Sequence, residues 1–488
     1  MHLLSRREML HRCSNGFGFL ALSALLSEYA PTVIAKEETR GNGLHLPARA
    51  KNVIFLFMDG GPSQVDTFDP KPLLNQRHGE RFPASIDATQ FDQNGTIFGT
   101  PFKFEPRGDS GLTISELFPK LAEHADKLCV IRSMKSDFAE HSQACMFLHT
   151  GNPVQGRPSL GAWVNYGLGS ENRELPGYVV INGGLLPIGG PENFSNSFLP
   201  AIHQGTFFNT FGNQEVVQNV KPSFAVDTQR SLVEFIQKGD SHYVNSLTAA
   251  GAVSGGSANG VDANIQSANQ AIEGAIQNYE TALAMQTAVP HLVDFSDESE
   301  ATLRLYGVDS KNPLISQYAK QCLLARRLVE SGVRFVELTC VKGIRFIAPW
   351  DDHENIEEGH RKNAEVVDQP VAALISDLAQ RGLLDSTLIV FAGEFGRTPF
   401  AQGNRGRDHN PQGFSIWLAG GGVRGGFRYG ATDEFGYRAV DQVVSMHDLH
   451  ATILHLLGID HERLTFRWGG RDFRLTDVYG NVVKDCLV

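Results

Sequence analysis

Long runs of basic residues are missing from this chain of 488 residues. The 54 acidic side chains outnumber the 43 basic ones, and the net charge at neutral pH is −11. Proteins that bind nucleic acids neutralise phosphate groups with basic side chains, so the composition argues against DNA or RNA as a partner. The content of 41% hydrophobic and 20% charged residues indicates an ordinary soluble globular protein.

Close pairs of cysteines are also missing. The six cysteines are widely spaced, at Cys13, Cys129, Cys145, Cys322, Cys340 and Cys486. Such spacing excludes a zinc knuckle built from thiolates and a small scaffold held by disulfides. One or two disulfides are compatible with the remaining cysteines, but we expect buried free thiols.

No apolar run is long enough for an ordinary transmembrane helix. The chain opens with Ser5-Arg6-Arg7, continues into the apolar segment Phe17–Leu26 and reaches a small-residue cleavage pattern at Val33–Ala35. These three parts are typical of an export signal, and the adjacent arginines fit the twin-arginine type. We therefore predict a periplasmic or secreted protein with no stable transmembrane anchor after signal cleavage. The alternative is a basic amphipathic helix at the N-terminus.

Short apolar runs alternate with amphipathic segments along most of the chain. The pattern predicts strands at residues 53–58, 127–132, 178–181, 333–340, 386–392 and 414–418. It predicts helices at residues 113–125, 141–151, 157–167, 314–330, 365–381 and 447–457. Strands that alternate with helices indicate an α/β fold, with a mostly parallel sheet flanked by helices on both faces.

Residues 183–310 have a different composition. The stretch begins rich in Gly, Pro and Asn, residues 247–270 have low complexity, and residues 266–286 have helical composition. We interpret it as a large insertion that caps the sheet and contains a connector. The predicted organisation is a signal peptide (1–35), an α/β domain in two parts (36–182 and 311–488), and an inserted cap or lid region (183–310).

Acidic side chains follow three of the predicted strands. Asp59 comes directly after the first strand, Asp351 lies in the loop after the fourth, and Glu394 follows the fifth. Because the carboxyl ends of parallel strands lie at one edge of a sheet, we expect these side chains to converge. The alternative for Asp59 is a turn residue that accepts only local hydrogen bonds.

Two clusters of Asp and His add imidazoles to this edge, Asp351-Asp352-His353 and Asp408-His409. Carboxylates and imidazoles brought together are unfavourable unless a cation is present. Mixed oxygen and nitrogen ligands suit zinc, manganese or iron, and carboxylates alone suit calcium or magnesium. We predict a divalent metal (zinc, calcium, manganese or magnesium) held by Asp59, Asp351, His353, Glu394, Asp408 and His409. Taken alone, an Asp-His pair is more often an ordinary surface feature.

Several segments together resemble the exported proteins of domain-of-unknown-function family 1501. They are the leader, Met58–Ser63, Phe198–Pro200, His203–Thr206, Trp350–His353, Gly393–Pro399 and Asp408–Asn410. This resemblance covers nearly the whole mature chain. The layout also resembles the alkaline phosphatase and sulfatase superfamily, whose members have a metal-binding Asp after the first strand, a nucleophile at a helix start, and further Asp and His ligands.

The superfamily resemblance implies a nucleophile ten residues before the glycine that closes the helix at Gly151, and this position is His141. A histidine there could form a phospho-imidazole, act as a base or bind metal, and Ser142 is the alternative nucleophile. The chain also has Phe395 where the superfamily has a ligand after the strand-end acid. This departure predicts a site with one metal.

Arginines near the predicted site are candidates for binding an oxyanion. Arg397 follows Glu394 closely and either pairs with it or clamps a substrate oxyanion. Arg405 and Arg407 are weaker candidates for the same role.

Three further histidines are open to interpretation. His447 and His450 are one turn apart on a predicted helix, and we interpret them as helix-face residues and not ligands. His360 is an alternative ligand, but its Glu-rich surroundings favour a solvated face.

The resemblance implies an exported metal-dependent hydrolase of a sulfate or phosphate ester. Its substrate would be an ester of a small molecule or a glycan, and His141 and Arg397 would be the catalytic groups. The missing hydroxyl nucleophile supports the alternative, a non-catalytic exported binding or assembly protein on the same fold. A transferase that uses an acceptor other than water would share the same site.

Overall fold

The computed structural model describes residues 44–89, 91, 93–212, 215–218, 228, 231, 235, 238, 278–343 and 348–488. The predicted signal peptide, Cys13 and the predicted connector at residues 247–270 lie outside the described residues. The helix predicted for residues 266–286 is described from residue 278 and continues to residue 293.

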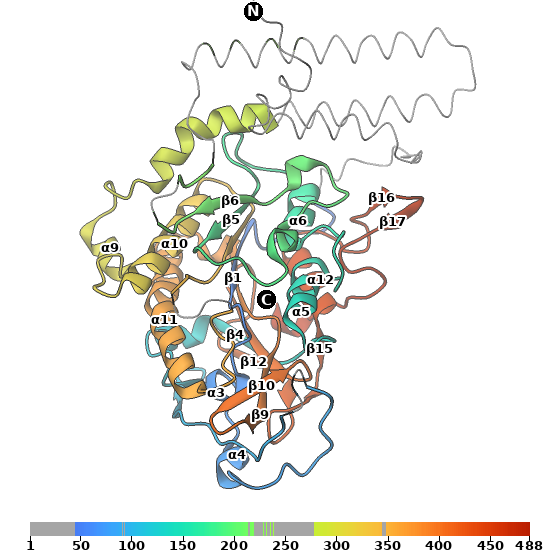
Figure 1. Ribbon diagram of the computed structural model, residues 1–488. Helices are drawn as coiled ribbons and strands as arrows, with labels where there is room; N and C mark the ends of the chain where they lie inside the picture. Colours follow the sequence, from blue (N-terminus) through green and yellow to red (C-terminus); the bar gives the residue numbers. More distant parts are fainter. Residues whose placement is uncertain are drawn as a thin grey trace, which may run out of the picture.

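A mostly parallel sheet forms the centre of the described structure (Figure 1). Its strands are β1 (Asn52–Phe57), β4 (Leu128–Lys135), β5 (Tyr178–Asn182), β6 (Thr206–Asn209), β7 (Phe335–Leu338), β8 (Thr387–Ala392), β11 (Phe414–Ala419), β12 (Phe427–Tyr429) and β15 (Val444–Ser445). The order is β12-β4-β11-β8-β1-β7-β5-β6, and β15 also pairs with β4. Strand β11 runs antiparallel to both of its neighbours, and the other pairs are parallel.

Helices cover both faces of this sheet, as the sequence pattern predicted (Figure 1). One face packs against α10 (Pro313–Glu330) and α11 (Ile356–Gln380), and the other against α5 (His141–Thr150), α6 (Leu160–Leu168) and α12 (Met446–Leu456). The α/β fold class is therefore confirmed.

The side chains of strand β1 pack into two hydrophobic cores, one on each face of the sheet. Ile54 and Leu56 belong to the hydrophobic core under α10 and α11, whereas Val53, Phe55 and Phe57 belong to the core under α5, α6 and α12. All five side chains are buried. Successive side chains of a strand point to opposite faces, so a strand between two helical layers must be apolar throughout.

Shorter elements connect these layers. They are α3 (Gln64–Thr67), α4 (Pro72–Gln76), β2 (Phe104–Arg107), β3 (Leu112–Ser115), η2 (Leu121–Lys127), η3 (Gly190–Phe194), η4 (Ala201–His203), α9 (Glu300–Tyr306), η5 (Leu384–Ser386), β9 (Gly396–Gln402), β10 (Gly406–Asn410), β13 (Ala431–Thr432), β14 (Ala439–Asp441), β16 (Phe466–Trp468), β17 (Arg471–Phe473) and η6 (Lys484–Cys486). Strand β6 comes from the range 183–310 that the sequence predicted as a cap, and it adds an edge strand beside β5.

Two of the predicted elements differ from the structure. The helix predicted at residues 113–125 is wrong, because Leu112–Ser115 pairs with β2 as a hairpin and Pro119 interrupts the segment before η2. Helix α11 begins nine residues earlier than predicted, since the Asn355 side chain caps it by accepting the Glu358 N–H.

The five cysteines within the described residues are buried and free, as expected from their spacing. No helix of the described part has both the length and the apolar character needed to cross a membrane.

A buried cluster of ion pairs joins the segment before α9 to α10 and α11. Arg326 contacts Glu298 at 2.5 Å and Asp377 at 3.0 Å, and Arg327 contacts Glu298 at 2.7 Å. The Arg326 and Glu298 side chains are 3% and 7% exposed, so neither charge is well solvated. Each charge therefore depends on its partner for compensation.

The substitution Glu298→Gln should lower the free energy of unfolding by about 3 kcal/mol, because it leaves two guanidinium groups partly unpaired in the interior. Urea denaturation measures this change. The control Glu300→Gln removes an exposed partner of Arg304 and should cost less than about 0.5 kcal/mol. Equal effects of the two substitutions would contradict a stabilising role for the buried cluster.

Candidate metal centre

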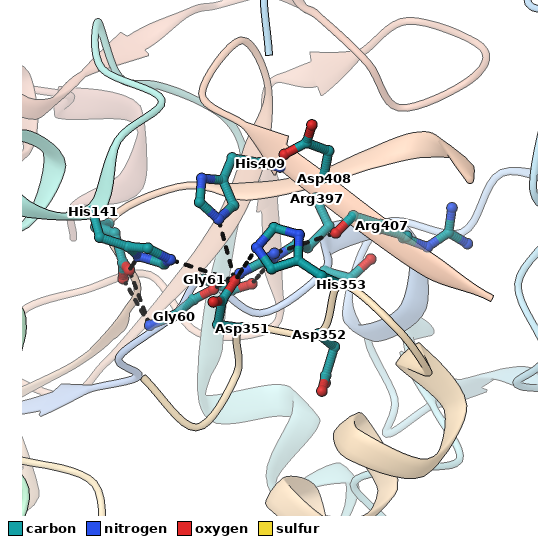
Figure 2. Close-up of polar contacts among 12 residues, drawn as sticks. Gly60, Gly61, His141, Asp351, Asp352, His353, Arg397, Arg407, Asp408 and His409 are labelled. Atoms are coloured by element: carbon teal, nitrogen blue, oxygen red, sulfur yellow. Dashed lines mark hydrogen bonds and ion pairs between the residues drawn. The ribbon is translucent and has the colours of Figure 1, made fainter. Parts of the chain in front are cut away.

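The candidate centre lies at the carboxyl ends of β1, β7 and β8. Asp59 follows β1, Asp351 lies in the loop after β7, and Glu394 follows β8. The first turn of α5 and the β9–β10 hairpin add further side chains to the same place (Figure 2). Segments from residue 59 to residue 409 thus meet at one edge of the sheet.

Local sequence places one imidazole at the start of α5. The helix begins at His141 because the Glu140 carboxylate accepts the Gln143 N–H at 3.2 Å, which caps the first turn. It ends at Gly151, whose φ of 68° is the left-handed conformation that glycine favours. The caps fix where the helix begins and ends, and the fold places its first turn at the strand ends.

Four side chains form a group that we call the open group: His141, Asp351, His353 and His409. Each offers one ligand atom, and these atoms lie within 4.8 Å of one another. The Oδ1 atom of Asp351 is at the centre, 2.7 Å from His353 Nε2, 3.2 Å from His409 Nε2 and 3.4 Å from His141 Nε2. Figure 2 shows the three rings pointing toward this carboxylate.

The Nδ1 atom of each histidine in the open group lies within hydrogen-bonding distance of an oxygen. His141 Nδ1 lies 2.7 Å from Glu394 Oε1, and His409 Nδ1 lies 2.6 Å from the Ala139 carbonyl oxygen. His353 Nδ1 makes the corresponding contact with Gln402 Oε1. Because these oxygens accept hydrogen bonds, each Nδ1 carries the proton. In the neutral rings the Nε2 lone pairs then point at Asp351, an arrangement typical of metal-ligating histidines.

His409 and His141 of the open group have pKa values shifted in opposite directions. Burial is the main cause that lowers the pKa of His409 to about 3, so this ring is neutral at ordinary pH. Burial also disfavours charge on His141, but the hydrogen bonds to Asp351 and Glu394 outweigh it and raise the pKa of His141 to about 9. Burial alone would raise the pKa of Asp351, yet Arg397 and the imidazoles hold it well below its usual value. Without a cation, a proton on His141 compensates the carboxylates.

Three buried side chains form a second, deeper group: Asp59, Cys145 and Glu394. Glu394 joins the two groups, because it accepts the Gly60 N–H at 3.0 Å and also contacts His141. Burial and then the nearby Glu394 raise the pKa of Asp59 well above its usual value. The Oδ1 atom of Asp59 is buried and has no hydrogen-bond partner among the described residues, which leaves it available to a proton or a cation.

Sequence reasoning missed Cys145 as a donor. It lies four residues after His141 on α5, and residues at this spacing share one helix face. Given His141 at the site, the helical spacing of four residues is the sequence signal that points to Cys145. The thiol is fully buried, and burial raises its pKa well above the usual value.

Arg397 is directed into the interior, and its donors are engaged by the protein itself, so the geometry does not support the predicted oxyanion clamp. Its side chain is fully buried. Its donors contact the carbonyl oxygens of Gly60, Gly61 and Arg407 and the Asp351 carboxylate, the last at 2.7 Å. The predicted pair with Glu394 is replaced by this pair with Asp351, which holds the acid of the open group in place.

The backbone after β1 touches the loop that carries Asp351. Gly60 has a φ of +106°, and a Cβ atom there would lie 2.5 Å from the Asp351 nitrogen. Any side chain at this position would push the two loops apart. Glycine therefore permits the close approach that brings the first strand end to the open group.

Asp408 and its two neighbouring arginines lie outside both groups. The Asp408 carboxylate accepts the N–H groups of His409 and Phe91, at 2.8 and 3.3 Å, and points away from Asp351 in Figure 2. Arg407 is buried against Asp66, and Arg405 forms an exposed pair with Glu357. The geometry supports neither a ligand role for Asp408 nor an oxyanion role for these arginines.

His360, His447 and His450, the three histidines left open by the sequence, have structural partners. His360 is fully buried, contrary to the predicted solvated face, and its Nδ1 lies 2.6 Å from Asp352 Oδ2. Its Nε2 accepts the Ser63 N–H at 2.8 Å. His447 and His450 contact the carbonyl oxygens of Gly151 and Leu148, at 2.9 and 2.7 Å, so they join α12 to α5.

The open group is reached through its least buried members. The Asp351 and His353 side chains are 24% and 19% exposed, whereas His409 is 1% exposed. The half-exposed ring of Phe91 lies 4.9 Å from the His353 ring, centroid to centroid. Sequence reasoning did not identify Phe91, because only the folded chain brings its loop to the centre.

Comparison with a model of the family DUF1501, described as "Protein of unknown function", gives a match over residues 50–487. No match was found among curated proteins.

Several solved structures are similar at low sequence identity. The lipoteichoic acid synthase LtaP from Listeria monocytogenes has a TM-score of 0.38 at 10% identity, covering 89% of this chain and 78% of LtaP. The PsFucS1 sulfatase from Pseudoalteromonas sp. has a TM-score of 0.34 at 13% identity, covering 91% and 72%. A protein in the alkaline phosphatase superfamily from Vibrio parahaemolyticus has a TM-score of 0.34 at 11% identity, covering 94% and 76%.

Metal binding at the open group should release a proton from His141. The pKa of about 9 means that the metal-free imidazole is protonated at neutral pH, and a cation must displace this proton. Affinity for Mn²⁺ should therefore rise about tenfold per pH unit and level off above about pH 9. Titration calorimetry in buffers of different ionisation enthalpy measures both quantities. Affinity that does not change between about pH 7 and pH 9 would contradict this assignment.

The substitution Arg397→Lys should weaken both the fold and the centre, because lysine keeps the charge but loses the Nε and Nη1 donors that bind the Gly61 and Arg407 carbonyls. We expect a loss of about 3 kcal/mol in the free energy of unfolding and of about tenfold in Mn²⁺ affinity. The control Arg405→Lys changes an exposed ion pair and should change stability by less than about 0.5 kcal/mol. Unchanged Mn²⁺ affinity in Arg397→Lys would refute its positioning role.

Proposed function

The chain belongs to the DUF1501 family, and we propose that it is an exported metal-dependent hydrolase of a sulfate or phosphate ester. The observation that carries this proposal is the convergence of three imidazole Nε2 atoms on one carboxylate oxygen of Asp351. Each ring is oriented by an acceptor at Nδ1. Three nitrogens and one carboxylate are a donor set that suits zinc or manganese better than calcium or magnesium.

The structural roles of the ligand residues follow from their exposure. His141 and His409 are buried and hold their rings rigidly, while Asp351 and His353 border the solvent. A bound divalent cation supplies Lewis acidity, which polarises the ester oxygen and lowers the pKa of a water nucleophile. Glu394 keeps His141 in the required tautomer, and Arg397 keeps Asp351 in place.

Among the roles considered for His141, metal ligand fits the geometry best. Its Nδ1 is occupied by Glu394, and its Nε2 belongs to the open group. The Ser142 hydroxyl donates to Glu140, the residue that caps α5. We therefore propose attack by water and not a covalent intermediate on the protein.

Phe91 is proposed to contact the substrate beside the centre. Its ring is 50% exposed and lies edge-on to His353. Its N–H group is bound to Asp408, the residue before His409, which ties the ring to the ligand hairpin. An aromatic surface at this place favours an ester whose leaving group presents a flat or apolar face, such as an aryl group or a sugar ring.

Export through a twin-arginine leader at residues 1–35 belongs to the same proposal, as does a cap within residues 183–310, of which β6 is part of the sheet itself. A folded, metal-loaded protein is the cargo that such a leader accepts. Because parts of both groups are buried, a metal that binds during folding would be retained during export.

Turnover of aryl sulfate and aryl phosphate esters by the metal-loaded protein tests the proposal. The substitution His353→Ala should lower kcat by about 100-fold or more, because it removes a ligand of the open group. The control His455→Ala lies on α12 outside both groups and should leave the rate nearly unchanged. A metal-loaded wild type that hydrolyses no ester would instead favour the non-catalytic binding protein.

A further inference from the structure

An aromatic and arginine-rich pocket lies at the opposite end of α5 from the metal centre. Helix α5 begins at His141, and the pocket is built around Gly151 at its end. Ten helical residues span about 15 Å, so the pocket is well separated from the open group. Its lining includes Asn152, Arg157, Trp163, Phe198 and Arg474. We call it the aromatic–arginine pocket.

A row of aromatic rings extends from Phe198, which lines this pocket, onto the β16–β17 hairpin. The Phe198 ring stacks on Phe466 and on Trp468, with centroid distances of 5.9 and 6.0 Å and interplanar angles of 19° and 16°. It also contacts Phe473 at 5.1 Å. The Trp468 side chain at the end of the row is 46% exposed. The β16–β17 hairpin therefore presents a flat aromatic face to solvent.

Arg157 is the cation of the pocket that makes no direct ion pair with a described residue, although the Asp477 carboxylate in the lining lies near enough to act on its charge. Its guanidinium carbon lies 4.3 Å from the Phe473 ring centroid, and that of Arg471 lies 4.9 Å from the same centroid. Arg471 pairs with Asp477, and Arg474 lies 3.4 Å from Glu462. Arg157 forms no ion pair or hydrogen bond with any described residue. A half-buried guanidinium that stacks on a ring and has N–H groups without a described acceptor can bind an oxyanion through two parallel hydrogen bonds.

The segment Phe198–Pro200, which is part of the family resemblance, contributes Phe198 to this pocket. Phe198–Pro200 contributes no side chain to either donor group of the metal centre. Instead Phe198 packs between Trp163 and the hairpin, at the base of the pocket. Phe198 of this segment therefore helps to build the aromatic–arginine pocket.

We propose that the aromatic–arginine pocket binds an anionic saccharide, a sugar ring that carries a sulfate or carboxylate group. The exposed Trp468 face stacks on the sugar ring, and the Arg157 fork pairs with the anion. An acidic peptide would use the guanidinium but would leave the aromatic face unmatched. The binding site stands without catalysis, and its use in holding a polymeric ester near the metal centre rests on the proposed function.

Calorimetry with the full metal-loaded chain tests this site. The probes are sulfated and carboxylated oligosaccharides, the desulfated counterparts, and a glutamate-rich peptide. Binding of a charged oligosaccharide should weaken at least about tenfold in Arg157→Ala and in Trp468→Ala. The control Arg467→Ala lies on the same hairpin, is paired with Asp472 and should change affinity less than about twofold.

Each outcome decides for or against the pocket. Weaker binding in Arg157→Lys than in wild type, with unchanged circular dichroism, supports the guanidinium fork. Three results would overturn the assignment. They are failure of every charged oligosaccharide to bind, binding of the desulfated probe or the peptide as tight as that of the charged oligosaccharide, and unchanged affinity in Arg157→Ala. Saccharide binding without ester turnover would refute only the proposed function, and turnover of small aryl esters without saccharide binding would refute only the pocket.

Discussion

One carboxylate oxygen, Oδ1 of Asp351, organises the candidate centre. Three imidazole nitrogens lie within 3.4 Å of it, and the Arg397 guanidinium contacts it at 2.7 Å. A carboxylate oxygen has too few lone pairs to accept from all of these groups at once. The crowding is favourable only when positive charge lies among the rings, supplied by a proton on His141 or by a metal ion.

The surrounding fold compensates the charges that this arrangement buries. Glu394 receives two contacts from Gly60 and one from His141, and Arg397 is held by three backbone carbonyls. Within the described part of the chain, the Oδ1 atom of Asp59 in the deeper group has no hydrogen-bond partner. Buried polar groups are normally satisfied, and exceptions concentrate where a ligand or a catalytic role accounts for them. The deeper group therefore has a free buried acceptor directly beside the open group, to which Glu394 joins it.

Much of the fold could be predicted from the sequence, because the signals are local. The apolar run before Asp59 indicated a strand buried on both faces, and Gly151 marked the end of α5. The failure at residues 113–125 has a tertiary cause, since Leu112–Ser115 pairs with a strand that helical periodicity does not reveal. The start of α11 at Ile356 depends on the Asn355 cap, and hydrophobic periodicity does not predict such a cap.

For the site, the sequence by itself determined the donor types and the strand ends that carry them: Asp59, Asp351, His353, Glu394 and His409 all lie in the two donor groups. Only the tertiary structure decided how the remaining residues are used. It placed Asp408 outside both donor groups, buried Arg397 against Asp351, and brought Cys145 into the deeper group. The physical reason is that strand order fixes which loops meet, whereas a side chain's partner depends on distances and burial that arise only when distant segments pack together.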